Sequence, residues 1–459
     1  MISAIVTSDN HLGAYYARFR PDRLEARRQA LRRNFERVVD AAIERRAQLF
    51  LHAGDLFDRP DPRNVERAFV ARQVRRLVDA GITICAIAGN HDRPRSLGYD
   101  SAAMPHEEME ALGAIHLFRQ TDALSSHELS INGRRVVVWG MSSDFNRPDG
   151  SCPLEGYDHR RAGDIDIALL HYGVEQWAPP LAHEPCLSLQ NLDRLQVDAI
   201  CVGHLHASNQ RRLPGGALLL NPGATEHINF GEEKLDCGFW ALQMTPGHVD
   251  AEYVSLPTQP MRTLSLSTED EGRRTEDGEE GARLEARGAG LSTRDTGEGA
   301  RLEDGEEGAR RGARGAGLEP RAPYPLPASR PAPRASYPLL KRWMTAIEAA
   351  GRPDQLLRVR LSGRLSPAEF RDLDLPALQN CGAAGNFHCQ VETDGLALID
   401  PLADLPIGYG VSFDVLDEIH STTAAAMELF GDNPAEQEVC RQAGAELEAA
   451  YSRLTGRER

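Results

Sequence analysis

Five apolar segments of the chain each end in aspartate, asparagine or histidine. In the stretch TICAIAGNHDRP at 83–94, an apolar run is followed by Gly89, Asn90, His91 and Asp92. A turn explains the glycine and the asparagine, which tolerate positive φ, but it does not explain the His-Asp pair. The other four segments end at Asp9 and His11, at Asp55, at His171, and at His204 and His206. Ligands of open α/β sheets lie beyond the carboxyl ends of the strands, so we expect these side chains to meet at one edge.

Each of these signals has an ordinary structural explanation when it is taken alone. A Gly-Asp pair after a strand, such as the one at Asp55, is usually a turn or a helix cap. An H-x-H pair such as His204 and His206 places two imidazoles on one side of an extended segment, and most single pairs of this kind bind nothing. For all five endings to be structural, the ordinary explanation would have to hold at every one of the five strand ends. We therefore interpret them as one site.

The candidate ligands supply nitrogen and oxygen atoms and no thiolate. They are Asp9, His11, Asp55, Asn90, His171, His204 and His206. Such a set suits Mn²⁺, Fe²⁺ or Zn²⁺ better than Ca²⁺ or a structural zinc ion, and it is large enough for two ions that share a carboxylate. Two ions roughly 3.5–4 Å apart can hold the attacking and leaving oxygens of a phosphoryl displacement. The remaining pair suits proton transfer, with His91 as donor to the leaving oxygen and Asp92 orienting it.

Strands and helices alternate over about the first 257 residues, which indicates an α/β fold. Helices are predicted at 21–46 and 64–80. Strands are predicted at 2–7, 48–52, 82–88, 135–139, 165–170, 199–202, 217–220 and 239–244. The early alternation predicts βαβ units, and the closer spacing of the later strands predicts a mixed sheet.

A segment of low complexity at 267–335 contains little but Gly, Ala, Arg, Glu and Pro. Within it, EDGEEGAR at 276–283 and ARGAGL at 286–291 each recur 27 residues later. A fixed period could indicate a solenoid. The repeats have too few large apolar residues to form a core, however, which favours a duplicated disordered insert. The proline-rich end at 323–334 is typical of a stiff, polyproline-like chain.

The segments on either side of the insert are predicted to form one small α+β domain. RTLSLS at 262–267, LLRVRLSG at 356–363 and HCQVET at 388–393 have the character of strands, and 338–351 has that of an amphipathic helix ending at a glycine. The expected parts are a first domain at 1–257, the first strand of the second domain at 258–266, the insert at 267–335, the rest of the second domain at 336–398 and a helical extension at 399–459. The extension could be a docking helix pair or a solvated segment.

The composition restricts the partners and the location of the chain. The formal charge is −16 and the mean hydropathy is −0.43, so any surface for a polyanion must be local. The sequence has no run of about 18 apolar residues and no basic, cleavable leader, so we expect neither a membrane span nor a secretory signal. Eight scattered cysteines without a C-x-x-C pair indicate free thiols in a reducing cytoplasm.

The motifs D-x-H, GD, GNH, a single histidine and GH-x-H, in this order, resemble the calcineurin-like metallophosphoesterases. SDNHLG at 8–13, GDLFDRPDP at 54–62 and NPGATEHINFGEE at 221–233 are similar to the SbcD-type DNA repair nucleases within that superfamily. The similarity extends from residue 1 to about 256, and LLRVRLSG resembles a strand of their small capping domain. The resemblance implies an α/β fold with a four-layer αββα core and a smaller α+β capping domain, here interrupted by the insert.

The resemblance also implies roles for residues and partners. One metal would be held by Asp9, His11, Asp55 and His206, and the other by Asp55, Asn90, His171 and His204, with Asp55 bridging. The implied cofactors are two divalent ions, with Mn²⁺ expected, and the implied activity is DNA exonuclease with endonuclease action at ends or hairpins. The implied partners are DNA and an SbcC-type coiled-coil ATPase bound through the C-terminal region; a homodimer stays open. Asp58 replaces a histidine of some relatives and is expected outside the metal ligands.

A basic stretch follows the first of the five segments. Residues 15–37 contain eight arginines and three acidic residues, with aromatic residues at the start. Arginines beside aromatic rings can hold a phosphate backbone and stack a base, which makes Tyr15, Tyr16, Arg18 and Arg20 candidates for DNA contact. The alternative is a solvated basic helix face.

Three functions are compatible with the sequence. The favoured one is a metal-dependent DNA nuclease of double-strand break repair. A small-nucleotide phosphodiesterase or phosphatase would use the same metal chemistry. A non-catalytic DNA-end scaffold for the ATPase is disfavoured, because a scaffold has no need to keep every ligand and His91.

Overall fold

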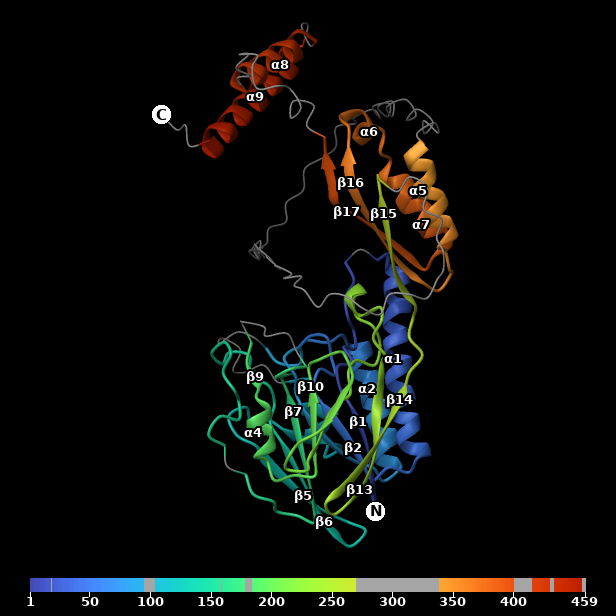
Figure 1. The fold of residues 1–459 in the computed structure, drawn as a ribbon, viewed down its shortest axis with the longest axis vertical. Helices are drawn as coiled ribbons and strands as arrows, with labels where there is room; N and C mark the ends of the chain where they lie inside the picture. Colours follow the sequence, from blue (N-terminus) through green and yellow to red (C-terminus); the bar gives the residue numbers. More distant parts are fainter. Residues whose placement is uncertain are drawn as a thin grey trace, which may run out of the picture. The chain divides into compact units, whose positions relative to one another are not determined.

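The computed structural model divides the chain into two compact units, residues 1–398 and 399–459. It describes residues 1–17, 19–94, 104–157, 159–177, 184–269, 338–399, 415–429 and 433–455. Nearly all of the predicted insert at 267–335 lies outside the described residues, and so does Arg18. The first unit contains two sets of strands (Figure 1). The strands of one set all precede the insert in the sequence, and those of the other set come from both sides of it.

Two six-stranded mixed sheets form the centre of the first domain. The strands of the first sheet are β1 (Ile2–Thr7), β2 (Leu49–Ala53), β3 (Thr83–Ile87), β4 (His116–Phe118), β13 (Gly238–Thr245) and β14 (His248–Ser255). The strands of the second are β5 (Ser125–Ile131), β6 (Arg134–Gly140), β7 (Ile165–His171), β10 (Ala199–Gly203), β11 (Asn209–Arg212) and β12 (Leu218–Asn221). Their orders are β14-β13-β1-β2-β3-β4 and β11-β12-β10-β7-β6-β5. The short strands β8 (Gly173–Val174) and β9 (Cys186–Leu187) pair beside them.

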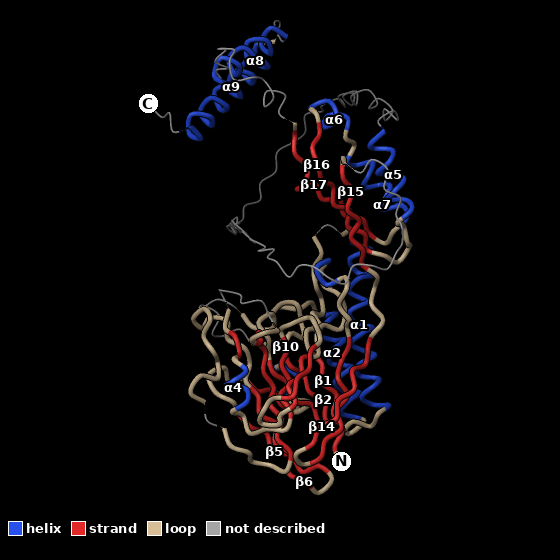
Figure 2. Tube along the Cα trace, viewed as in Figure 1, coloured by secondary structure: helices blue, strands red, loops and turns tan. Residues whose placement is uncertain are grey.

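Helices and loops cover the outer faces of the two sheets. The helical segments of this domain are α1 (Pro21–Glu44), α2 (Asn64–Asp79), α3 (Glu107–Ala111), α4 (Leu189–Asp193) and the 3₁₀ turn η1 (Phe230–Glu232). One hydrophobic cluster packs α1 and α2 on the first sheet, a second fills the space between the sheets, and a third covers the outer face of the second sheet. Figure 2 shows the strands of both sheets between helices. The predicted four-layer αββα core is confirmed.

The strands of a three-stranded sheet come from both sides of the insert in the sequence. Its strands are β15 (Met261–Ser267), β16 (Leu356–Leu365) and β17 (His388–Leu398), and its helices are α5 (Pro338–Ala349), α6 (Pro367–Asp372) and α7 (Leu375–Gly385). The strand before the insert pairs in parallel with β16 after it, and Leu264 lies opposite Val359. Trp343 and Ile347 of α5 are fully buried in the core of this sheet. We call β15, β16 and β17 the capping sheet.

The second unit consists of two packed helices, α8 (Val415–Leu429) and α9 (Pro434–Thr455). Gln437 donates a hydrogen bond to the carbonyl oxygen of Met427 at 3.2 Å, and His420 contacts Glu448 at 3.1 Å. Among the helices that the structure describes, none has the length and apolar character needed to cross a membrane.

Candidate metal centre

The carboxyl ends of the strands bring the predicted side chains together. Strands β1, β2 and β3 are parallel neighbours in the first sheet, and β7 and β10 are parallel neighbours in the second. The backbone N–H of Asp9 donates to the carbonyl oxygen of Gly54 at 3.0 Å, and His171 Nδ1 lies 2.7 Å from the carbonyl oxygen of Ala53. The first bond joins two neighbouring strand ends of the first sheet, and the second joins the first sheet to the second, so the polar strand ends form one site.

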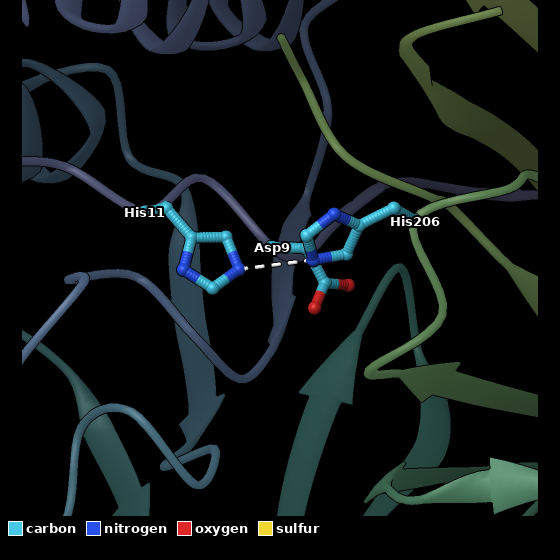
Figure 3. Close-up of side chains that lie close together, drawn as sticks. All are labelled: Asp9, His11 and His206. Atoms are coloured by element: carbon cyan, nitrogen blue, oxygen red, sulfur yellow. Dashed lines mark hydrogen bonds between the residues drawn. The ribbon is translucent and has the colours of Figure 1, made fainter. Parts of the chain in front are cut away.

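Asp9, His11 and His206 form the first group of donor atoms (Figure 3). Their ligand atoms all lie within 4.8 Å of one another, and His11 Nε2 faces His206 Nε2 at 3.1 Å. His206 Nδ1 lies 2.9 Å from Glu232 Oε1. Two imidazole nitrogens that face each other beside a carboxylate are a suitable donor set for a divalent cation.

Asp9, Asp55 and His171 form a second group, all of them buried. His171 Nε2 lies 3.2 Å from Asp55 Oδ2 and 3.2 Å from Asn90 Oδ1. The same Asp55 oxygen is 3.8 Å from His11 Nε2. Asp9 belongs to both groups, and one oxygen of Asp55 lies near His11 of the first group and near His171 of the second, where a bridging ligand would have to be.

His204 lies next to the second group. Its ring centroid is 5.5 Å from that of His171, and its Nε2 atom is 3.1 Å from a carboxylate oxygen of Glu184. Its backbone N–H contacts both carboxylate oxygens of Asp9 at 3.1 Å. All seven predicted ligands thus lie at the same sheet edge.

The backbone at these strand ends adopts a conformation that side chains usually avoid. Asp9, His11, Asp55 and His204 have φ values of 50°, 44°, 55° and 102°. Non-glycine residues at positive φ are uncommon, and strained backbone clusters at functional sites. Such strain persists only where the surrounding structure holds it, and here four of the seven predicted ligands share it.

Glycine is required immediately before two of the ligands. Gly54 has φ +94°, and a Cβ atom there would collide with the ring of His171. A Cβ atom at Gly89 would collide with the carboxylate of Asp55. The GD and GNH motifs therefore contain glycine because the ligands pack directly on the backbone.

The charges of the site are strongly coupled. Burial lowers the pKa of His171, but Asp55 and Asp9 outweigh burial and raise this pKa to about 9. Burial likewise lowers the pKa of His11, and Asp58, Asp55 and Asp9 raise it to about 9. Burial raises the pKa of Asp55, but the three surrounding histidines hold it well below its usual range. The carboxylates thus attract positive charge, which a divalent ion can supply in place of protons.

The structure corrects the role expected of Asp92. Its buried carboxylate accepts hydrogen bonds from the backbone N–H groups of Leu56, Phe57 and Gly89 at 2.9–3.3 Å. It therefore ties the loops after β2 and β3 together. The ring of His91 is oriented instead by the backbone of Asp58.

Asp58 also lies closer to the centre than the sequence suggests. Its carbonyl oxygen is 2.9 Å from His91 Nδ1, and its carboxylate Oδ1 is 3.4 Å from His11 Nδ1. Asp58, His11 and His91 form a third group of close donor atoms. A side chain that is expected outside the metal ligands thus contacts one of the predicted ligands.

The basic stretch after β1 is used partly for folding. Arg27 is fully buried, 3.2 Å from Glu226, and its guanidinium lies over the ring of Tyr16 at 5.7 Å. Arg28 is also buried and donates to the carbonyl oxygen of Ala14 at 2.9 Å. These arginines and the ring of Tyr16 are therefore engaged within the protein.

The remaining candidates for DNA contact differ from Tyr16. Tyr15 is 64% exposed, and the side chain of Arg20 is 84% exposed. Arg18 lies outside the described residues. Tyr15 and Arg20 thus keep the accessibility that contact with a nucleic acid requires.

Glu232 and Glu184 contact predicted ligands, but the sequence analysis did not single them out. Glu232 lies in the GEE of the quoted stretch 221–233, so its position near a motif was the available signal. Burial raises the pKa of Glu232, yet bonds from His206 and from the backbone N–H of Ile228 lower it overall. It is therefore a charged partner of His206. No comparable signal marks Glu184.

The comparisons with known proteins agree with this geometry. Residues 2–208 match the calcineurin-like phosphoesterase family. The chain is 26% identical over 267 residues to the DNA double-strand break repair protein Mre11 of Sulfolobus acidocaldarius, covering 57% of this chain and 65% of that protein. It is 26% identical over 230 residues to the Mre11 of Sulfurisphaera tokodaii, covering 50% and 54%.

The chain thus spans between about half and two thirds of the length of these curated relatives. Among solved structures, a dimetal phosphatase from Danio rerio matches 55% of this chain and 95% of its own, at 14% identity and a TM-score of 0.33. Residues 2–208, which carry all seven predicted ligands, form a calcineurin-like phosphoesterase domain, and the chain is similar in sequence to the Mre11 repair proteins.

Proposed function

We propose that this chain is a DNA nuclease of double-strand break repair, an exonuclease that also acts as an endonuclease at ends or hairpins. The observation that carries the proposal is that two donor groups meet at one edge of the stacked sheets: they share Asp9, and one oxygen of Asp55 lies near a histidine of each group. The names of the curated relatives support DNA as the substrate.

Two divalent ions, with Mn²⁺ as the proposed metal, fit the donor atoms of this centre. The proposed ligands are Asp9, His11, Asp55 and His206 for one ion, and Asp55, Asn90, His171 and His204 for the other. Imidazole, carboxylate and amide donors without a thiolate suit Mn²⁺. Such a pair of ions would supply Lewis acidity and an activated water for in-line attack on phosphorus.

His91 is the proposed proton donor to the leaving oxygen. Its Nδ1 atom is engaged by the carbonyl oxygen of Asp58, and its backbone N–H donates to Asp55 Oδ1 at 2.9 Å. Its ring also packs edge-on against that of His11, with centroids 4.7 Å apart. These contacts hold the ring beside the centre and leave Nε2 to exchange a proton with the substrate.

Exposed residues beside the centre are the proposed contacts to DNA. Tyr15 and Arg20 follow β1 and can stack a base and pair with a phosphate. Because the whole chain carries a charge of −16, we expect this binding to be local and sensitive to salt.

The proposed protein partner is an SbcC-type coiled-coil ATPase that docks on the second unit. Val439 and Leu447 of α9 are 65% and 59% exposed there, which gives a partner helix apolar surface to cover. The proposed location is the cytoplasm. All eight cysteines are free, as expected in a reducing compartment.

Cleavage of end-labelled linear duplex DNA tests the proposal directly. We would compare the wild-type chain with His91→Ala in Mn²⁺, in Mg²⁺ and in chelator, and run a chromogenic phosphodiester in parallel. Mn²⁺-dependent shortening of the DNA that the variant loses is the expected result. Hydrolysis of the chromogenic diester alone, both without and with an added SbcC-type ATPase, would contradict a DNA nuclease and favour a small-nucleotide phosphodiesterase.

A further inference from the structure

The buried carboxylate of Glu232 is fixed by three neighbouring groups. It is 6% exposed at the end of η1, and Oε1 lies 2.9 Å from His206 Nδ1. Oε2 accepts the backbone N–H of Ile228 at 2.7 Å, and Asn229 donates to Oε1 as well. A carboxylate held in this way gives its histidine partner one orientation.

The bond to Glu232 determines which nitrogen of His206 faces the candidate metal centre. A carboxylate only accepts, so Nδ1 carries the proton and Nε2 carries the lone pair. Nε2 is the atom that faces His11 Nε2 at 3.1 Å and shares the donor group with Asp9. Carboxylate partners of this kind orient metal-binding histidines and raise their basicity.

The segment that carries Glu232 is also in contact with the capping sheet. The guanidinium of Arg358 on β16 lies 4.9 Å from the centre of the Phe230 ring and donates to the carbonyl oxygen of Phe230. Glu233 accepts a hydrogen bond from Thr263 of β15 at 2.6 Å, and Arg358 donates to the same hydroxyl at 2.9 Å. Residues 230–233 therefore contact two strands of the capping sheet and one ligand of the centre.

The second donor group has a different support. His171 Nδ1 is held by the carbonyl oxygen of Ala53, at the end of β2 inside the first domain. A displacement of the capping sheet would therefore reach His206 through η1 without changing the bond that orients His171.

We propose that Glu232 is a positioning residue for His206, and that η1 transmits the position of the capping sheet to this ligand. The inference rests on the proposed function only in requiring that His206 binds an ion. The capping sheet thereby influences the metal site that contains His206 and not the site that contains His171.

Titration of the full chain with Mn²⁺, followed by the electron paramagnetic resonance of free Mn²⁺, tests the positioning role. His206→Ala and His171→Ala identify the binding step that belongs to each group. We expect Glu232→Ala to weaken the His206 step by about 10–100-fold and to leave the His171 step unchanged. Glu232→Gln keeps an acceptor oxygen, so it should weaken the His206 step less than Glu232→Ala does. Glu252→Ala is the matched control, because its exposed carboxylate pairs with Arg45 on the first domain, away from η1 and the capping sheet.

A second pair of variants tests the connection to the capping sheet. Arg358→Met removes the contacts with Phe230, whereas Arg360→Met, two residues along the same strand, removes an ion pair with Glu392. We expect Arg358→Met to weaken the His206 step and Arg360→Met to bind both ions as the wild type does. Equal affinities in these two variants would overturn the transmission through η1.

Two further outcomes separate this inference from the proposed function. If the wild-type chain binds two Mn²⁺ ions and Glu232→Ala binds both with unchanged affinity, the positioning role is overturned. Equal weakening of both steps together with a lower melting temperature would show that Glu232 is merely structural. Failure of the wild type to bind a second ion would instead overturn the two-metal proposal.

Discussion

The Nδ1 atom of His91 lies 2.9 Å from the backbone carbonyl oxygen of Asp58. Because a carbonyl oxygen can only accept, Nδ1 carries the proton of this bond and the ring keeps one tautomer. The ring thus depends on the backbone of the loop after β2, and a substitution of the Asp58 side chain would leave this bond in place.

Replacing His91 should separate metal binding from turnover. We expect His91→Ala to bind Mn²⁺ as the wild type does and to lose turnover by roughly 10²–10⁴, the range typical of a general acid. Metal analysis of the purified protein and the rate of DNA cleavage check both parts. His248→Ala, which changes an exposed histidine paired with Asp250, is the control. A near wild-type rate would remove His91 from the mechanism.

Asp55→Asn should abolish activity and reduce the bound metal. The substitution removes the charge of the proposed bridging ligand, and asparagine tolerates the φ of 55° at this position, so the backbone is preserved. Metal content by mass spectrometry and a thermal unfolding curve in chelator are the measurements. Asp61→Asn, in an exposed ion pair with Arg59, should change neither. Two ions retained in Asp55→Asn would contradict the bridging role.

Arg27→Met should destabilise the first domain by about 3–5 kcal/mol, because it leaves the buried carboxylate of Glu226 without its partner. Chemical denaturation gives the free energy of unfolding. The control is Arg33→Met, on the exposed face of α1, which should change the free energy of unfolding by less than about 0.5 kcal/mol. Similar values for both variants would show that the buried pair contributes little.

His52 should make the protein less stable in mild acid. Burial, followed by the neighbouring histidines, lowers the pKa of His52 to about 3 in the folded chain, whereas the unfolded chain binds the proton near pH 6.5. Between these values, stability falls as the pH falls, by about 1.4 kcal/mol per pH unit. The loss from pH 7 to pH 5, measured by denaturation in chelator, should be smaller in His52→Gln. An equal loss in both proteins would contradict this assignment.

Replacing residues 272–336 with a flexible linker should preserve folding and cleavage. Arg342 of α5 donates to the carbonyl oxygen of Ser267 at the end of β15 at 2.9 Å, so the two elements that flank the replaced segment in the sequence are in contact. A Gly/Ser linker of about ten residues spans on the order of 15–20 Å, which is sufficient. Melting temperature and DNA cleavage are the measurements. A marked loss of either would show that the replaced segment has a structural or catalytic role.

Much of the first domain could be predicted because its signals are local. The bounds of β1 and β7, and most of α1, follow from runs and periods of apolar residues, and so does the position of polar residues at the strand ends. The strands of the two sheets that were missed are β4, β5, β11 and β14. They lie at the edges of their sheets, and in β5 and β14 about half of the side chains face solvent, so the apolar signal is weak.

The sequence by itself determined which residue types follow the strands, and hence the candidate ligands and their chemistry. Only the tertiary structure decided their partners: Glu232 on His206, the carbonyl oxygen of Asp58 on His91, and the burial of Arg27 against Glu226 and His227. Arg27 and His227 are 200 residues apart in the chain. Apolar periodicity reports the secondary structure of a segment, whereas the environment of a charge depends on which distant segments fold against it.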